Sequence, residues 1–332
     1  MRFQLTDDQR ALRRGVRELL EARFDRDALR AAVDKAGGEA GGEPGDGPGP
    51  RLDRALWRVL GDAGFFALRL PEDAGGVGLG LPEAVLVFEE VGRVLLPGPL
   101  VATHLAAGVV PGAATGEAVV TMPDGALVAW LDEADAVLGD SGAVVGEADA
   151  GLGERGAVPG EGNAAGAVRL RSVDPLTPLH RLLCAAVGGV HDETQSDYVD
   201  YAALLTAAEQ LGSALRTTEL ATRYAREREQ FGRPIGSFQA VKHLCAQMFV
   251  RAELARAAVY AAAVTADPAE IAGAKLLADE AAVRGARDCL QVHGGMGFTW
   301  EADVHLHLKR AWVRARLWQT AERTEEVLAS AL

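Results

Sequence analysis

The sequence predicts a mainly α-helical protein with a small β-domain in its middle. Alanine and leucine are abundant and aromatic residues make up only 5% of the 332 residues, which favours helix over strand. Segments near both ends repeat apolar residues with the helical period, whereas the middle has short apolar runs between turn-forming residues. We therefore expect an N-terminal α-domain over residues 1–116, a β-domain over 117–192 and a C-terminal four-helix bundle over 193–332.

The N-terminal α-domain begins with a helix whose start is marked by a capping box. Thr6 is the expected N-cap, and Gln9 lies three residues later, where its side chain can bond back to the cap. Glycines and prolines are repeated in residues 35–50 and exclude a helix there. Further helices are expected over residues 53–68, 82–95 and 98–111.

The central β-domain is expected to consist of short, weak antiparallel strands. Its apolar runs are interrupted by Pro-Asp-Gly at 123–125 and Asp-Ser-Gly at 140–142, and both triplets are typical of tight turns. Runs of this length between turns favour strands over helices. We expect no long helix between residues 117 and 192.

The C-terminal domain is expected to be an antiparallel bundle, because it contains four long helical segments joined by short turns. The first segment begins near Asp197. Ser237 is the expected cap of the second, and an Asp-Pro pair at 267–268 is expected to start the third, since proline is favoured at the first helical position. The third should end at Gly294, and one last helix is expected over residues 301–332.

Charge and composition exclude several classes of function. The formal net charge of −13 argues against nucleic acid or an anionic membrane surface as a partner. The three cysteines are far apart and form no metal or disulfide pattern, as expected of a reduced cytoplasmic protein. We expect no metal site, because His305 and His307 are two residues apart and so face different sides of a helix. The N-terminus has no signal-peptide pattern, and no apolar run is long enough to span a membrane.

Four segments resemble those of the acyl-CoA dehydrogenase family. REREQFGRPIGSFQ, at 226–239, is similar to the family's Arg-x-x-Phe-Gly segment, and CLQVHGGMGFTWE, at 289–301, is similar to its Gln-x-x-Gly-Gly segment. LTDDQRALRRGVRELL, at 5–20, and the glycine-rich segment at 70–95 resemble its two N-terminal motifs. The resemblance implies an acyl-CoA dehydrogenase-like fold, in which an α-domain, a β-domain and a helical bundle follow one another.

The resemblance also implies an FAD-dependent activity. Enzymes of this family oxidise an acyl-CoA thioester between its α and β carbons, and each bundle lends residues to the flavin of its neighbour. Arg228 would then contact the pyrophosphate and Phe231 the adenine side, while glycines at 294 and 295 let the backbone approach closely. The cofactor-binding residues implied are Arg228, Gln230, Phe231, Ile235, Phe238, Gln239, Gln291, Gly294 and Gly295.

The chain departs from the family where the chemistry should occur. It lacks the Thr-Glu-Pro-x-x-Gly-Ser-Asp stretch that holds the flavin ring, so the β-domain is a reduced one. The two positions where members of the family carry the catalytic glutamate hold Trp318 and Ala202. Asp200 and Glu322 are the nearest acids, and neither is in register. A positioned base accounts for roughly 10²- to 10⁴-fold in rate, and we therefore expect no catalytic residue in this chain.

This pattern of loss resembles the non-catalytic subunit of heteromeric acyl-CoA dehydrogenases, in which two different chains share each flavin. Such pairs often oxidise bulky thioesters, including those of sterol side chains. We expect the chain to complete the FAD site of a partner subunit that carries the catalytic glutamate, in a dimer of heterodimers, and to bind little FAD alone. On its own it is expected to form a homodimer. The HLHLKRA segment at 305–311 also resembles these subunits.

Two alternatives remain open from the sequence. The chain is a divergent homomeric acyl-CoA dehydrogenase if an unrecognised base replaces the missing glutamate. It is a cofactor-free scaffold or binding protein if only the fold has been kept. Flavin bound to the isolated chain would favour the first alternative, and absence of flavin beside every partner would favour the second.

Overall fold

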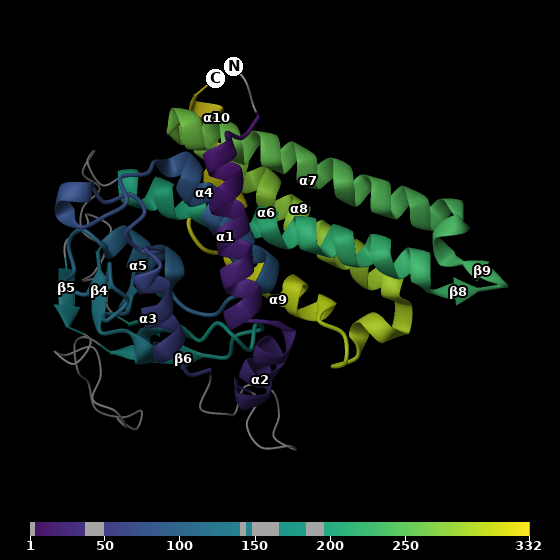
Figure 1. Ribbon diagram of the computed structural model, residues 1–332, viewed down its shortest axis with the longest axis horizontal. Helices are drawn as coiled ribbons and strands as arrows, with labels where there is room; N and C mark the ends of the chain where they lie inside the picture. The colour runs from purple at the N-terminus through teal and green to yellow at the C-terminus, as the bar shows by residue number, and fades with distance from the viewer. Residues whose placement is uncertain (1–3, 37–49, 140–143, 148–165, 184–195, 332) are drawn as a thin grey trace. The chain divides into compact units, whose positions relative to one another are not determined.

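The computed structural model describes residues 4–36, 50–139, 144–147, 166–183 and 196–331 (Figure 1). The chain divides into two compact units, and each unit combines segments that are distant in the sequence. The first comprises Met1–Asp25, Leu81–Leu96 and Ala203–Leu332, and the second comprises Arg26–Gly80 and Pro97–Ala202. Helices predominate and the strands are short, which confirms the predicted fold class.

The first unit is a helical bundle. Its helices are α1 (Asp7–Arg23), α4 (Leu81–Val94), most of α6 (Ser196–Glu227), α7 (Gln239–Thr265), α8 (Pro268–His293), α9 (Val304–Arg314) and α10 (Ala321–Ser330). Helix α7 packs along α8, and α8 packs in turn against α9 and α10. Helix α1 packs on α4 (Figure 1).

The start of α1 has the predicted capping box. The backbone N–H of Gln9 donates to the Thr6 hydroxyl at 3.1 Å, and the Thr6 N–H donates to the Gln9 side chain at 3.0 Å. Further along α1, the guanidinium of Arg17 donates two hydrogen bonds, of 2.8 and 2.7 Å, to the buried carboxylate of Glu90 on α4. This paired geometry fixes α1 on the bundle, since two parallel charge-assisted bonds are stronger and more directional than one.

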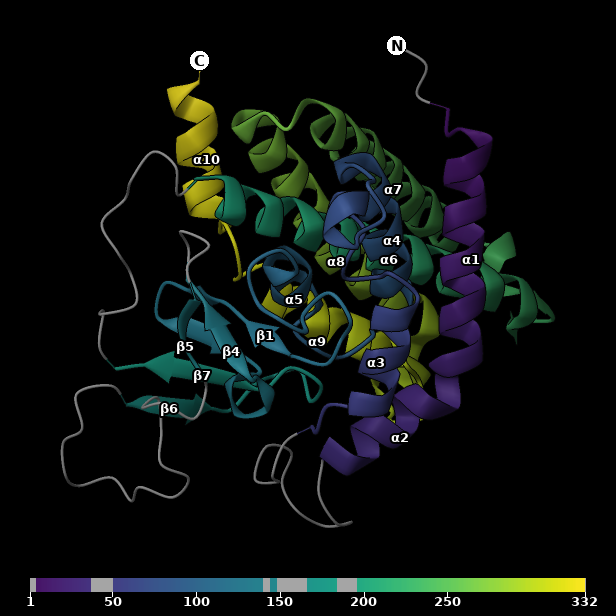
Figure 2. The same ribbon diagram turned by 60° about the vertical axis from the view of Figure 1, so that its left-hand side comes forward.

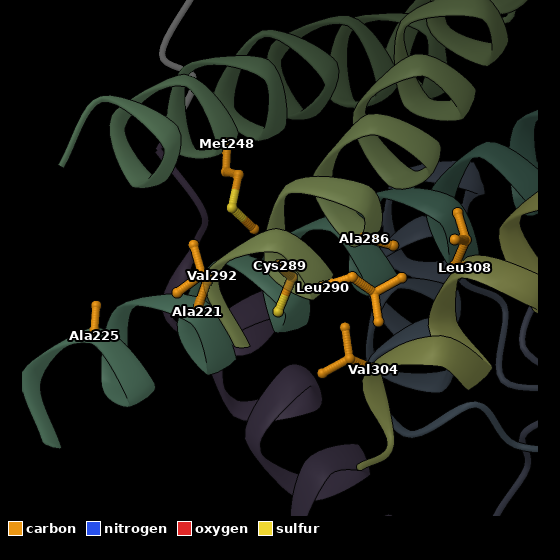
Figure 3. Close-up of a cluster of buried hydrophobic side chains, with 9 residues drawn as sticks. All are labelled: Ala221, Ala225, Met248, Ala286, Cys289, Leu290, Val292, Val304 and Leu308. Atoms are coloured by element: carbon orange, nitrogen blue, oxygen red, sulfur yellow. The ribbon is translucent and has the colours of Figure 1, made fainter. Parts of the chain in front are cut away.

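Close packing between α4 and α6 depends on glycine. A Cβ added to Gly92 would lie 1.9 Å from the Glu209 carbonyl oxygen, and one added to Gly212 would lie 1.9 Å from the Glu89 carbonyl oxygen. Any side chain at either position would separate the helices, because real Cβ atoms do not approach backbone so closely. Figure 3 shows the core at the other end of α6, where α6, α7, α8 and α9 meet. Its buried residues are Ala221, Ala225, Met248, Ala286, Cys289, Leu290, Val292, Val304 and Leu308.

Two expectations for the bundle were wrong. The single helix expected over 301–332 is divided into α9 and α10, because Trp318 (φ 52°) and Gln319 (φ 61°) adopt left-handed backbone conformations that end a right-handed helix. Ser237 does not cap α7, since it lies in a 3₁₀ turn and the N-cap position is Phe238, whose side chain makes no capping bond. The predicted cap Asp267 is confirmed, and its carboxylate accepts a 3.0 Å bond from the Glu270 N–H.

The second unit combines short helices with two small sheets (Figure 2). Its helices are α2 (Arg26–Ala36), α3 (Arg54–Asp62) and α5 (Leu100–Ala106). One sheet has the order β1 (Val120–Thr121), β4 (Ala136–Leu138), β5 (Val144–Glu147). The other has the order β2 (Pro123–Asp124), β3 (Leu127–Ala129), β7 (Leu179–Leu182), β6 (Ala167–Leu170).

One strand pair differs from the antiparallel arrangement expected for the β-domain. Strands β1 and β4 are parallel, whereas every other described pair in these two sheets is antiparallel. The β2–β3 hairpin and a 3₁₀ turn lie between these two strands in the sequence. They return the chain to the edge of β1 in the direction that β1 runs, so that β4 pairs with it in parallel. The bridging segment 140–143 and residues 148–165, which contain part of the predicted β-domain, lie outside the described residues.

Candidate cofactor-binding site

The Arg228 segment forms a two-stranded hairpin at one end of the first unit (Figure 1). Strand β8 (Glu229–Gln230) pairs with β9 (Arg233–Pro234), and the two residues between them form the tip. Both tip residues have positive φ, 53° at Phe231 and 74° at Gly232, as a two-residue hairpin of the I′ type requires. Glycine adopts this conformation freely, but it costs a bulky residue roughly 1–2 kcal/mol.

The tip of the hairpin presents an aromatic ring to solvent. Phe231 is 91% exposed, so the left-handed conformation there gains no core packing. Its ring makes an edge contact with Phe238 at 6.0 Å, and the guanidinium of Arg233 lies 4.3 Å from the centroid of the Phe238 ring. These contacts hold the hairpin in shape without covering Phe231, which leaves the ring available to another molecule.

Arg228 has a fixed backbone and an exposed side chain. Its N–H donates to the Tyr224 carbonyl at 2.8 Å, and its carbonyl accepts from the Ile235 N–H at 2.8 Å. Gln230 and Gln239 are also exposed, and the amide of Gln230 donates to the neighbouring Glu229 carbonyl at 2.9 Å. The segment is therefore a rigid support for outward-facing donors.

Ile235 and Phe238, the other predicted site residues near the hairpin, are partly buried and pack within the unit. Ile235 is half-buried and packs against the core cluster of Figure 3, which anchors the base of the hairpin. Phe238 is half-buried and stands at the N-cap position of α7. Apolar anchoring of this kind orients the exposed groups by burying their neighbours.

The Gln291 segment lies at the C-terminal end of α8. Gln291 is exposed on the last turn, and the helix ends at Gly294, whose N–H donates to the Gln291 and Leu290 carbonyls. Gly294 has φ 61° and ψ −142°, a conformation for which glycine is strongly preferred. A Cβ added to Gly294 or Gly295 would have no atom within 4 Å in the described chain, so the backbone there is open to an approaching group.

The fold brings the two segments together although they are about 60 residues apart in the sequence. The hairpin and the end of α8 lie at the same end of the bundle (Figure 1). Tyr224, in the last turn of α6, stacks on His293, the last residue of α8, with ring centroids 4.2 Å apart and 21° between the planes. A guanidinium, side-chain amides, open glycine backbone and an exposed ring fit the pyrophosphate and adenine of a dinucleotide such as FAD.

The positions expected for a catalytic glutamate hold no acid. Trp318 is buried, at 7% exposure, and Ala202 is fully buried. Of the neighbouring acids, Asp200 is buried on α6 and Glu322 is exposed in the first turn of α10. A left-handed backbone at Trp318 is unusual for a bulky residue and marks this loop as a strained one.

Sequence reasoning missed a buried polar network that joins α6, α8 and α9. Arg314 pairs with Glu209 at 2.9 Å, and Gln210 donates to Asp279 at 2.9 Å. Fully buried Lys275 pairs with Asp279 and donates to the Arg314 carbonyl at 3.2 Å. Burial raises the pKa of the Glu209 and Asp279 carboxyls, and the neighbouring Arg314 and Lys275 charges oppose that shift. The i, i+4 spacing of Lys275 and Asp279 was the one signal of this network in the sequence.

Comparison with known proteins identifies the family. The N-terminal domain of acyl-CoA dehydrogenase matches residues 6–118, and the acyl-CoA dehydrogenase C-terminal domain matches residues 194–332. The acyl-CoA dehydrogenase IpdE2 of Mycobacterium tuberculosis is 36% identical over 312 residues, which cover 90% of this chain and 93% of that protein. This chain belongs to the acyl-CoA dehydrogenase family. Acyl-CoA dehydrogenases are generally FAD-dependent, and the site described above lies in the domain of this family that matches at the C-terminus.

Other proteins similar to this acyl-CoA dehydrogenase family member include chains of heteromeric complexes. The IpdE2 of Mycolicibacterium smegmatis is 33% identical over 326 residues, covering 94% of this chain and 95% of that protein. The ChsE4-ChsE5 complex from Mycobacterium tuberculosis contains a chain with a TM-score of 0.77 and 26% identity, covering 99% of this chain and 98% of that one. A variant of the Tcur3481-Tcur3483 steroid acyl-CoA dehydrogenase gives a TM-score of 0.79 at 25% identity, with 98% and 97% of the two chains covered.

No helix in the described part of the chain is both long and apolar enough to cross a membrane. Among the same residues, no group of three or more His, Cys, Asp and Glu side chains is arranged to hold a metal ion. The absence of a metal site therefore stays a prediction for the chain as a whole.

Proposed function

We propose that this chain is the non-catalytic subunit of a heteromeric, FAD-dependent acyl-CoA dehydrogenase and that it completes the FAD site of a partner subunit. One observation carries the proposal. The two cofactor segments face solvent, with Arg228, Phe231 and Gln291 exposed, while both positions for a catalytic glutamate hold apolar residues, Trp318 and Ala202. The chain has thus kept groups that reach outward and lost the group that reacts.

The residues of this chain bind and orient the cofactor in this proposal. Arg228 holds the pyrophosphate through charge-assisted hydrogen bonds, which are worth roughly 1.5–3 kcal/mol. Gln291 and Gln239 contribute neutral hydrogen bonds, and Phe231 covers the adenine side. Bound FAD would supply the hydride acceptor for oxidation of the acyl-CoA at its β carbon. The base that removes the α proton belongs to the partner.

The outer surface of α7 supports assembly with another subunit. Four large apolar residues on this helix are exposed: Phe249 at 56%, Val250 at 54%, Leu254 at 56% and Val264 at 66%. Apolar residues on all sides of a helix are typical of a helix that is covered on all sides. A partner of the same fold would cover this surface in a dimer of heterodimers, and without that partner the chain would cover it as a homodimer. We expect the complex to act in the cytoplasm.

The relatives suggest a substrate class. The Tcur3481-Tcur3483 protein is described as a steroid acyl-CoA dehydrogenase, and its fold covers 98% of this chain. We propose an acyl-CoA thioester carried by a steroid, such as a side chain undergoing β-oxidation, or a fatty acyl-CoA. The acyl group would be bound mainly by the partner, because the partner supplies the reacting base.

Flavin content tests the proposal. The chain is purified alone and together with an acyl-CoA dehydrogenase-type protein that carries the catalytic glutamate, and the visible spectrum and acyl-CoA oxidation are recorded for both preparations. We expect a nearly colourless, inactive single chain and an active complex with one FAD per heterodimer. Stoichiometric FAD and activity in the single chain would establish a homomeric dehydrogenase instead. Absence of flavin from the assembled complex would favour a scaffold.

A further inference from the structure

The stacked pair Tyr224 and His293 connects the two cofactor segments. The rings are nearly parallel, at 21°, and their centroids are 4.2 Å apart. Both side chains are half-buried, and Tyr224 also packs against the core cluster of Figure 3. Stacked aromatic pairs contribute beyond the area they bury, and their planar contact restricts relative rotation.

Each ring is attached closely to its own segment. The Tyr224 carbonyl accepts the N–H of Arg228 at 2.8 Å, so the backbone of Arg228 moves with the turn that carries Tyr224. On the other side, His293 lies two residues after Gln291 and directly before Gly294, whose N–H donates back to the Gln291 carbonyl. A displacement of either ring would therefore be transmitted to the cofactor-facing groups of that segment.

The His293 ring is oriented by a hydrogen bond, and the chain that follows it packs closely on its Cβ. Its Nδ1 lies 2.8 Å from the Cys289 carbonyl oxygen, which can only accept, so Nδ1 carries the proton of this hydrogen bond. A Cβ added to buried Gly297 would lie 3.1 Å from the His293 Cβ, so the chain after Gly295 also packs tightly on this residue. Burial lowers the pKa of His293, and the Arg223 charge acts in the same direction, while the hydrogen bond to the Cys289 carbonyl partly opposes the shift.

We propose that Tyr224 and His293 are positioning residues, whose stack fixes the distance between Arg228 and Gln291 so that both reach one bound FAD. This inference rests on the proposed function, because it assigns both segments to a single cofactor. Neither ring needs to touch the flavin. Their role is to hold two distant parts of the chain in one geometry, which lowers the ordering cost of binding.

The first test measures FAD affinity in the complex of this chain with its partner. Tyr224→Leu and His293→Asn each remove the stack, and His293→Asn keeps a side-chain N–H for the Cys289 carbonyl. We expect each variant to weaken FAD binding about two- to tenfold, as the loss of one aromatic pair predicts. Tyr224→Phe keeps the ring and should retain wild-type affinity. The double variant should bind FAD with about the same affinity as the single variant that binds it less tightly, because both changes remove the same contact.

A second test uses hydrogen exchange in the full chain without FAD. The amides of Arg228, Ile235 and Gly294 are hydrogen-bonded and report on the two segments. We expect Tyr224→Leu to speed hydrogen exchange at the amide of Gly294 as well as at that of Arg228. We expect His293→Asn to speed exchange at the same two amides. Faster exchange confined to the altered segment would overturn the proposal.

The two tests also separate the positioning role from the proposed function. If Arg228→Ala weakens FAD binding in the complex but Tyr224→Leu does not, the cofactor site stands and the positioning role is wrong. If Arg228→Ala and Gln291→Ala both leave the affinity unchanged, the proposed function fails, and the positioning of one FAD by the stack fails with it. A third outcome is that Tyr224→Phe and Tyr224→Leu both lose thermal stability but bind FAD with equal affinity. The pair would then contribute to stability alone and have no positioning role.

Discussion

The phenol of Tyr260 donates a 2.6 Å hydrogen bond to the carboxylate of Glu89, and this bond joins α7 to α4 within the first unit. Glu89 is 2% exposed, so its carboxylate has almost no water around it. Burial raises the pKa of Glu89, while the bond from Tyr260 and the charge of Arg256 partly offset the shift. The same burial, together with the Glu89 charge, raises the pKa of Tyr260.

The raised pKa of Glu89 predicts a pH dependence of stability. In the folded state this carboxyl keeps its proton at pH values where the unfolded chain, with a pKa of 4.5, has released it. The unfolded state therefore binds fewer protons, and the contribution of Glu89 to stability falls as the pH rises above about 4.5. We expect the free energy of unfolding of Glu89→Gln minus that of wild type to be larger at pH 7 than at pH 4, so the variant is relatively more stable at pH 7.

Urea unfolding of both proteins at the two pH values checks this expectation. Glu83→Gln on the same helix is a suitable control, because the side chain of Glu83 is only partly buried. A stability difference between Glu89→Gln and wild type that does not change with pH would contradict the raised pKa.

Arg228 and Gln291 are expected to affect a cofactor whose chemistry belongs to the partner. Arg228→Ala removes a charged donor, and we expect FAD to bind the complex about tenfold or more weakly, since 1.4 kcal/mol corresponds to tenfold. Gln291→Ala should act in the same direction with a smaller effect, because its hydrogen bonds are neutral. FAD titration of the co-purified complex measures both effects.

Arg226→Ala is the matched control for the arginine variant. Arg226 is also exposed and lies two residues before Arg228, but it is the last-turn arginine of α6 and stands outside the cofactor motif. Subunits should co-purify in all three variants. Unchanged FAD affinity in both Arg228→Ala and Gln291→Ala, with intact complexes, would mean that these residues do not contact a flavin.

The exposed apolar surface of α7 is expected to be buried in the complex. Leu254→Glu places a charge at the middle of this surface, and an unpaired charge is costly in an apolar interface. We expect this variant to fold but to lose its partner during gel filtration. Val109→Glu changes a similarly exposed valine elsewhere, at 43% exposure, and should leave assembly unaffected. Assembly of Leu254→Glu at wild-type affinity would exclude this surface from the interface.

Trp318→Glu is not expected to create a dehydrogenase. A carboxylate is productive only when a flavin ring and the α carbon of the substrate are held next to it, and the chain lacks the stretch that holds the ring. The isolated variant, checked for folding by circular dichroism, should show no oxidation of acyl-CoA thioesters with added FAD. Measurable turnover would mean that the isolated chain has a competent acyl pocket.

All nine proposed cofactor residues could be found from the sequence, since the two motifs are short and contiguous. The exposure of these side chains to solvent could not be predicted from the sequence. Phe231 is itself apolar, and Gln291 follows Cys289 and Leu290, so only the packed bundle determines that both side chains face outward. The stack of Tyr224 on His293 was equally invisible, because it joins residues 69 positions apart through the packing of α6 against α8.

The sequence by itself determined the features that depend on neighbouring residues. The capping box at Thr6, the cap at Asp267 and the Gly294 helix end are local patterns, which involve residues no more than about four apart. Tertiary structure alone decided the parallel pairing of β1 with β4, the left-handed break at Trp318 and the bond between Tyr260 and Glu89. These features depend on which distant segments meet in the folded chain, and their energies come from packing and burial that no local pattern encodes.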